Sequence, residues 1–145
     1  MRALTVEEPL SFPRAAPLHA VVPIRSPDAS ALRALGYARS VASHLTVLQL
    51  PGEDSALTRK RLRRLGAAFG AEFVQLAAGR DPIEQVVTAI DAISADDPDH
   101  RVVVVLSGIV PRHPWLLPLH DQSLRLKLRL FGHPKVAVID VPYHV

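Results

Sequence analysis

Short apolar runs alternate with segments of helical spacing along most of this chain, and this alternation most constrains its fold. The apolar runs, which we expect to be strands, are His19–Ile24, Leu45–Leu50, Glu72–Ala77, Arg101–Leu106 and Lys135–Val141. Consecutive runs lie far enough apart for a crossover helix, as parallel strands require. The pattern therefore predicts an α/β domain with a parallel sheet and helices on both faces. The valine run of the fourth strand is typical of a strand buried on both faces.

The segments between these runs carry helix start and stop signals. Ser26-Pro27 has the form of an N-cap followed by proline, and predicts a helix that continues to about Ser43. A second helix is expected over Glu53–Phe69, with Gly70 past its end. Asp81-Pro82-Ile83-Glu84 resembles a capping box that opens a third helix. The residues expected to face the core are Ala31, Leu35, Ala38, Ala42, Leu62, Leu65, Phe69, Ile83, Val86, Val87, Ile90 and Ile93.

The segment Leu124–Leu130 can be read in two ways. Leucine alternates with arginine and lysine, which is a strand pattern. However, these residues are good helix formers and none is β-branched. Since a crossover is needed before the last strand, and since Leu124, Leu128 and Phe131 would share one face of a helix, we predict a helix.

Composition limits the classes of protein that this chain can represent. It has no cysteine, which excludes disulfides, thiolate metal sites and a cysteine nucleophile, and suits a reducing cytoplasm. No apolar run approaches the ~20 residues that span a bilayer. Charged residues and prolines interrupt residues 1–17, so we expect no signal peptide. We predict a flexible arm or linker over residues 1–18 and one cytoplasmic domain over residues 19–145.

The motifs of common enzyme and metal sites are missing from the sequence. It contains no G-x-G-x-x-G, Walker A, G-x-S-x-G or H-E-x-x-H pattern. His113 and His120 flank a loop and are either metal ligands or ordinary loop residues. Asp96, Asp97 and Asp99 follow a helix and predict a solvated turn rather than paired catalytic carboxylates. We therefore expect no catalytic residues and no metal site.

Two further features have competing interpretations. The basic run Arg59–Arg64 predicts a solvated helix face, with an anionic membrane surface and then nucleic acid as alternatives. We expect no nucleic-acid partner, because stacking aromatic residues are scarce near this run. Trp115 is expected to pack its loop onto the domain, and a ligand-stacking platform is the alternative.

In a sheet of this kind, ligands bind beyond the carboxyl ends of the strands, where the strand order reverses. We place that point between the first and fourth strands, so the loops of interest are Arg25–Asp28 and Ser107–Leu119. Arg25 is either a phosphate or carboxylate ligand or a solvated loop residue.

The chain resembles a known family in two places. Ala20-Val21-Val22-Pro23-Ile24 and the alanine-rich helix after it look like the first β-α unit of universal stress proteins, a Rossmann-like fold with strand order 3-2-1-4-5. Arg80 after the third strand also fits. The blocks Leu119–Leu128 and Val138–Val145 resemble the cytosolic C-terminal domain of amino acid–polyamine–organocation superfamily permeases, including KUP-like potassium importers.

Departures from the universal stress protein pattern make ordinary ATP binding doubtful. Arg25 stands near the usual aspartate, only Gly108 remains of the phosphate-loop glycines, and Gln122-Ser123 replaces their Gly-Ser pair. The resemblance leaves cyclic di-AMP or an adenine nucleotide as candidate ligands. The candidate crevice residues are Arg25, Ser26, Ser107, Gly108, Arg112, His120, Gln122 and Ser123.

The resemblance implies a non-enzymatic regulatory and dimerisation domain of a cation or amino-acid permease. The permease part would lie in the same or a neighbouring chain, at the inner face of the membrane. The alternative is a free-standing nucleotide-binding protein related to universal stress proteins. The last strand is expected to be an edge that pairs with a second copy. Its candidate interface residues are Val136, Val138, Asp140, Val141 and Tyr143.

Overall fold

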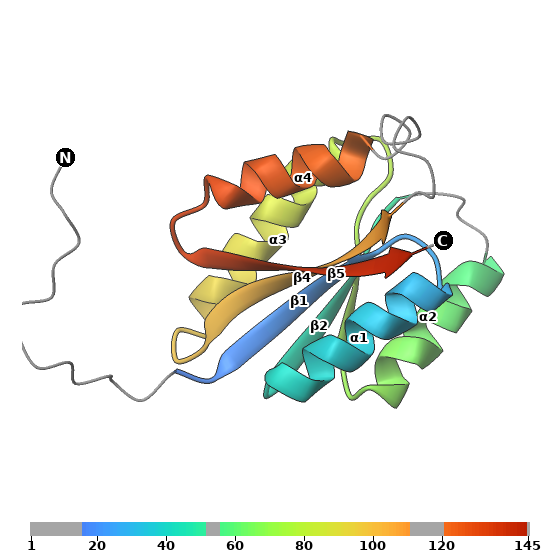
Figure 1. The fold of residues 1–145 in the computed structure, drawn as a ribbon, viewed down its shortest axis with the longest axis horizontal. Coiled ribbons are helices and arrows are strands. Elements are labelled where there is room, and N and C mark those ends of the chain that lie inside the picture. The colour runs from blue at the N-terminus through green and yellow to red at the C-terminus, as the bar shows by residue number, and fades with distance from the viewer. Residues whose placement is uncertain (1–15, 52–55, 111–120, 145) are drawn as a thin grey trace, which may run out of the picture.

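A computed structural model describes residues 16–51, 56–110 and 121–144 of the chain. Figure 1 shows one twisted sheet between two layers of helices. In chain order the elements are β1 (Leu18–Ile24), α1 (Ala29–Val41), β2 (His44–Gln49), α2 (Ala56–Ala68), β3 (Glu72–Gln75), α3 (Pro82–Asp96), β4 (Arg101–Val110), α4 (Asp121–Phe131) and β5 (Val136–His144). All neighbouring strands are parallel and their order is β3-β2-β1-β4-β5, which confirms the predicted fold.

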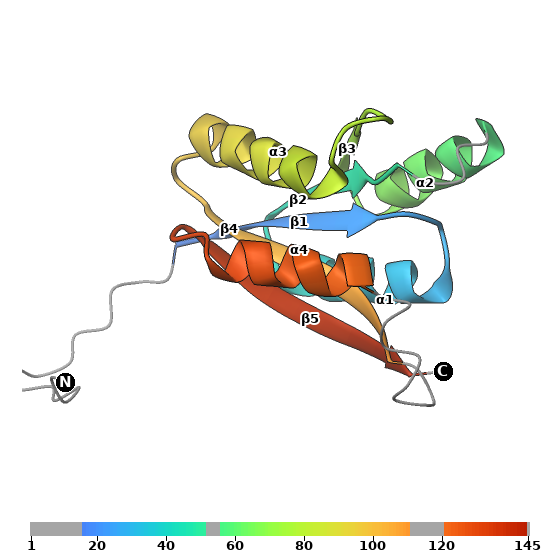
Figure 2. The same cartoon turned by 90° about the horizontal axis from the view of Figure 1, so that it is seen from above.

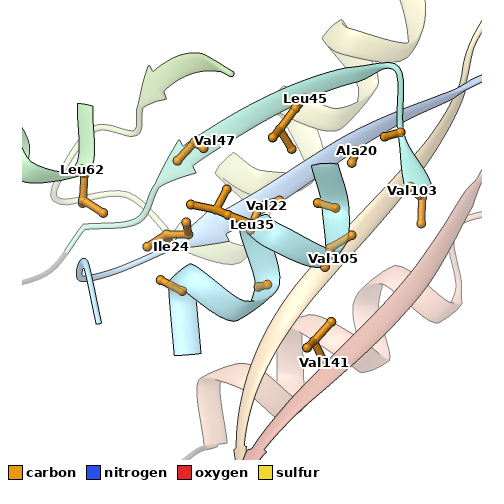
Figure 3. Close-up of a cluster of buried hydrophobic side chains, with 14 residues drawn as sticks. Ala20, Val22, Ile24, Leu35, Leu45, Val47, Leu62, Val103, Val105 and Val141 are labelled. Atoms are coloured by element: carbon orange, nitrogen blue, oxygen red, sulfur yellow. The ribbon is translucent and has the colours of Figure 1, made fainter. Parts of the chain in front are cut away.

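The sheet has a separate core on each face (Figure 2), with α1 and α2 on one side and α3 and α4 on the other. Successive residues of a strand point to opposite faces, so β1 and β4 contribute to both cores. Figure 3 shows the core under α1 and α2, where Val22, Val47 and Val105 meet Leu35 and Leu62. Val102 to Leu106 are all buried, which confirms that β4 is covered on both faces.

The start of α1 differs from the prediction. Asp28, not Ser26, is the N-cap, because Asp28 Oδ1 accepts hydrogen bonds from Ala31 N at 2.9 Å and Ser30 Oγ at 2.6 Å. Ser26 Oγ donates to the other carboxylate oxygen of Asp28 at 3.0 Å. The helix also ends at Val41, before Ser43, because Ser43 N donates to Leu18 O at 3.0 Å and so joins the edge of the sheet.

Other predicted helix signals are confirmed. Asp81 caps α3 by accepting a hydrogen bond from Ile83 N at 3.0 Å, with proline next in sequence. Gly70 follows α2 with φ of +69°, a left-handed conformation that favours glycine. The predicted inner residues of α1 and α3 are buried, apart from the partly buried Ile93.

Residues 121–131 form a helix, as predicted, but Leu128 and Phe131 do not lie on its buried face. Leu126 and Leu130 are buried, whereas Leu128 is 62% and Phe131 67% exposed. Alternating leucines in a helix form two stripes, each with a spacing of four residues, so local spacing alone gives no preference between them. Packing against α3 and β4 decides in favour of Leu126 and Leu130.

Several strands also have different ends from those predicted. β4 continues to Val110 because it pairs with β5 along its whole length, including Ser107 with Val141 and Gly108 with Pro142. Ser107 and Gly108 therefore lie in a strand, whereas we expected them in a loop. β3 ends at Gln75, and the following Ala77 N instead donates to Gln85 Oε1 of α3 at 2.8 Å.

Candidate functional site

The carboxyl ends of the strands form the edge where the sequence predicted a ligand crevice. β1 and β4 are neighbours, and the strand order reverses between them. Arg25 and Ser26 follow β1 directly, and Ser107 and Gly108 lie in the last part of β4. Arg112 and His120, with His113 and Trp115, lie outside the described residues. Gln122 and Ser123 lie in the first turn of α4.

The N-terminus of α1 lies at this carboxyl edge, and the Asp28 side chain accepts a hydrogen bond from its first turn. The Asp28 carboxylate accepts from Ala31 N at the position where a bound phosphate would accept. Burial raises the pKa of Asp28, but hydrogen bonds from Ser30, Ala31 and Ser26 lower it more, so the net shift is downward. Asp28 is therefore negatively charged at neutral pH. A ligand phosphate at this edge would need positively charged side chains from other elements.

Such cations line a hollow of about 490 Å³ between the start of α1 and α2. Arg61 and Arg64 of α2 lie on one side of it, and Pro27 and Asp28 on the other. The apolar part of its wall includes Leu32 and Leu65. A hollow with apolar walls and a few charged groups is typical of small-molecule sites. In the sequence, the two arginines are recognisable only as part of the basic run Arg59–Arg64.

Gln49 adds an unpaired hydrogen-bond acceptor to the same end of the sheet. It is the last residue of β2 and is only 4% exposed. Its Oε1 is buried and has no hydrogen-bond partner among the residues that the structure describes. Gln49 lies opposite Ile24 in register, so it belongs to the face covered by α1 and α2. A buried acceptor without a donor is costly, so a ligand N–H group that reached it through a local opening would relieve that cost.

The basic run itself lies on the outer side of α2. Leu62 is buried, whereas the four arginines and one lysine around it are exposed. The guanidinium carbon of Arg63 lies 5.3 Å from the centre of the Phe73 ring, a cation–π contact with β3. This arrangement agrees with the predicted amphipathic helix, although two of its arginines also face the hollow.

The predicted interface residues lie on β5, which is an edge of the sheet. Val141 is buried in one core, and Val136 and Val138 pack against the other. Lys127 of α4 forms an ion pair with Asp140. A second hollow of about 470 Å³ lies between α1 and β5, lined by Arg33, Tyr37 and residues 139–142.

The opposite, amino-terminal edge of the sheet holds a cluster that the sequence analysis missed. His19 of β1 and His44 of β2 lie side by side in register. Asp97, which follows α3, lies close to both, and its Oδ2 is 2.9 Å from Nδ1 of His19 and 2.9 Å from Nδ1 of His44. The two rings are almost perpendicular, at 87°, with centroids 5.6 Å apart. Two imidazole nitrogens thus converge on one carboxylate oxygen.

Further polar groups surround this His–Asp cluster. His100 Nδ1 lies 2.7 Å from the other oxygen of Asp97, and its Nε2 lies 3.1 Å from Ser43 Oγ. His19 Nε2 lies 2.8 Å from Thr46 Oγ1, which is buried in β2. Hydrogen bonds with His44 and then with His19 and His100 outweigh burial and lower the pKa of Asp97 to about 2.

The predicted solvated turn is confirmed at Asp96 and Asp99, which are exposed, but Asp97 differs from the prediction. The turn exists, but the side chain of Asp97 is only 20% exposed and contacts three histidines. No local motif marks this cluster, because its members come from β1, β2 and the connection between α3 and β4. The available signal was a histidine at the start of two adjacent strands, together with an Asp-x-x-His sequence just before a third.

Comparison with known proteins identifies the family. None of the helices that the structure describes is both long and apolar enough to cross a bilayer. A search of curated proteins found no match. The family model of the KimA potassium transporter C-terminal domain matches residues 16–143, nearly the whole chain and all nine secondary-structure elements except the end of β5. The chain therefore belongs to the family of KimA potassium transporter C-terminal domains.

Proposed function

We propose that this chain is a regulatory domain of a KimA-type potassium transporter, that it acts on the cytosolic side of the membrane and that it catalyses no reaction. Membership of the family over residues 16–143 supports the link to potassium transport. The ligand that we propose is cyclic di-AMP or a related adenine nucleotide, bound at the carboxyl edge of the sheet.

The unpaired Gln49 Oε1 is the observation that carries the ligand-binding part of this proposal. The exocyclic amine of adenine is a donor of the kind that this acceptor lacks. Arg61 and Arg64, on the same face, supply positive charge for phosphate groups. Two arginines match the two phosphates of cyclic di-AMP, whereas ATP carries more charge and normally binds a glycine-rich loop.

Arg25 and Ser26 begin the loop that leads from β1 to this hollow. We propose them as further ligand contacts, together with Ser107 and Gly108 on β4. Arg112, His120, Gln122 and Ser123 complete the proposed set. A ligand that extended from this hollow across the end of β1 to the end of β4 would contact loops from both halves of the sheet, which gives it a means to change their relative position.

Calorimetry on the untagged chain with cyclic di-AMP, ATP and AMP tests the ligand. We expect cyclic di-AMP to bind, and Gln49→Met and the double variant Arg61→Ala/Arg64→Ala each to weaken binding about tenfold or more. Arg39→Ala is the matched control, because Arg39 is exposed in the last turn of α1, at its other end. Heat with ATP or AMP alone would favour the free-standing nucleotide-binding alternative, and no heat with any of the three would exclude nucleotide sensing.

A homodimer through β5 is the second part of the proposal. β5 has nine residues and an outer edge that no strand of the sheet covers, so it offers main-chain hydrogen bonds to a second copy. Pro142 has no N–H to donate, so pairing would use mainly the part of β5 before it. Light scattering at high concentration should give the mass of two chains, and a strict monomer would contradict the dimer.

A further inference from the structure

We propose that the His–Asp cluster at the amino edge is a binding site for a divalent transition metal ion, with Zn²⁺ as the best match. The ligands are His19 Nδ1, His44 Nδ1 and Asp97 Oδ2, and these three atoms all lie within 4.8 Å of one another. Two imidazoles and one carboxylate form a donor set that zinc prefers. The site lies at the opposite end of the strands from the proposed nucleotide crevice.

The distances fit a metal with only a small adjustment. Zinc bonds of about 2.0–2.2 Å in tetrahedral geometry place neighbouring ligand atoms about 3.4 Å apart. Asp97 Oδ2 is now 2.9 Å from Nδ1 of each histidine, so each of these two distances needs to lengthen by about half an ångström. The strand register fixes the spacing of His19 and His44, and both of them precede apolar core residues. The sheet therefore holds two of the three ligands in place before a metal arrives.

The groups around the cluster allow the protonation state that metal binding needs. Without a metal, the Asp97 carboxylate can only accept, so Nδ1 of His19 and Nδ1 of His44 each donate a proton to it, and a metal ion would take the place of those protons. A histidine that binds a metal through Nδ1 carries its proton on Nε2, where an outer partner usually accepts it. Thr46 Oγ1 lies 2.8 Å from His19 Nε2 and is able to accept that proton. His100 Nδ1 contacts Asp97 Oδ1 at 2.7 Å, so it orients the carboxylate from behind without competing for Oδ2. This is the arrangement of first ligands and outer partners that metal sites commonly show.

Among the described residues, His44 is the most exposed histidine of the cluster. The side chain of His44 is 53% exposed, whereas those of His19 and His100 are 9% and 14% exposed. A metal ion would enter beside His44, and water would take the fourth position. Arg101 N donates to Pro17 O at 2.9 Å at the same edge, so a bound metal would stiffen the place where the chain enters β1.

The test is titration of the untagged, chelator-treated chain with Co²⁺ and Zn²⁺. We expect one equivalent of Co²⁺ to give the visible absorption of tetrahedral cobalt, and one equivalent of Zn²⁺ to displace it. We expect His44→Ala to lower the affinity at least about a hundredfold. Because His44 is exposed, this variant should fold, and circular dichroism would check that. Asp97→Asn keeps the shape of the side chain but removes the carboxylate ligand, so we expect it to lower the affinity for metal as well.

His133→Ala is the matched control. His133, which follows α4, also contacts a carboxylate, since its Nε2 lies 2.7 Å from Asp91 Oδ1 of α3, but its Nδ1 accepts from Lys135 N at 3.2 Å and it lies outside the His–Asp cluster. This variant should bind Co²⁺ like the original chain. The proposal would be overturned if the folded chain bound no metal in a one-to-one ratio, or if His44→Ala and Asp97→Asn bound it as tightly as His133→Ala does.

Discussion

The two edges of the sheet differ in how the residues of their proposed sites are encoded in the sequence. At the carboxyl edge, Arg25 and Ser26 follow directly from the end of β1, so their position was predictable from the strand pattern. At the amino edge, the His–Asp contacts join residues 78 and 53 positions apart. The contrast shows that loops after strands can be located from local patterns, whereas a cluster built across strands depends on their register.

Both edges belong to one sheet, whose stability depends on the helices packed against it. Substitutions in α4 should have the largest effect on that stability. The chain runs along α4 from the carboxyl edge towards the amino edge. Leu130→Ala should lower the free energy of unfolding by about 2–5 kcal/mol, because Leu130 is fully buried. Chemical denaturation of the free domain measures this loss.

Leu128→Ala is the matched control for Leu130→Ala. Leu128 is 62% exposed on the same helix, so the change should stay within about 0.5 kcal/mol. If Leu128→Ala proved the more destabilising variant, Leu128 rather than Leu130 would face the core, contrary to the burial of these two side chains.

The next largest effect concerns the amino edge without metal. His19→Ala should destabilise the fold by about 1–3 kcal/mol, because it leaves the buried Thr46 hydroxyl without its ring partner. His44→Ala should cost less, about 1 kcal/mol or below, since His44 is exposed. Thermal unfolding in the presence of a chelator compares the two. Equal losses of stability in the two variants would mean that the buried contact between His19 and Thr46 adds nothing to the stability of the fold.

The smallest effect concerns the start of α1 at the carboxyl edge. Asp28→Ala should cost about 1 kcal/mol near neutral pH, because it removes the N-cap. The pKa of Asp28 is lowered in the folded state, so its carboxylate stabilises the fold above about pH 5 and that contribution is lost as the pH falls below about 4. Denaturant titrations from pH 7 to pH 3 should therefore show the two proteins converging in acid. If the difference in unfolding free energy stayed constant with pH, the capping effect would not depend on the charge of Asp28.

Much of the fold was predictable because local signals were strong and consistent. The valine run of β4, the Asp81 cap and Gly70 each fix local structure with little help from the rest of the chain. The inner face of α4 was not predictable, since its two leucine stripes are equivalent until α3 packs against one of them. The extension of β4 likewise depends on its pairing with β5.

The candidate sites were predictable only in part. Arg25 was found from its place after β1, but Gln49 looks like an ordinary strand end in sequence, and only burial reveals its missing partner. Arg61 and Arg64 are not distinguishable from their basic neighbours until the hollow beside α1 is known. Asp97 looks like a turn residue until the register of β1 and β2 brings two histidines to it.

Backbone NMR of the labelled chain during titration with cyclic di-AMP tests the central claim most directly, because every amide reports on its own edge of the sheet. We expect the largest shifts at Arg25, Gln49 and Arg61, with His19 and His44 almost unchanged. Shifts centred on His19, His44 and Asp97, or no saturable shifts at all, would contradict the assignment of ligand sensing to the carboxyl edge.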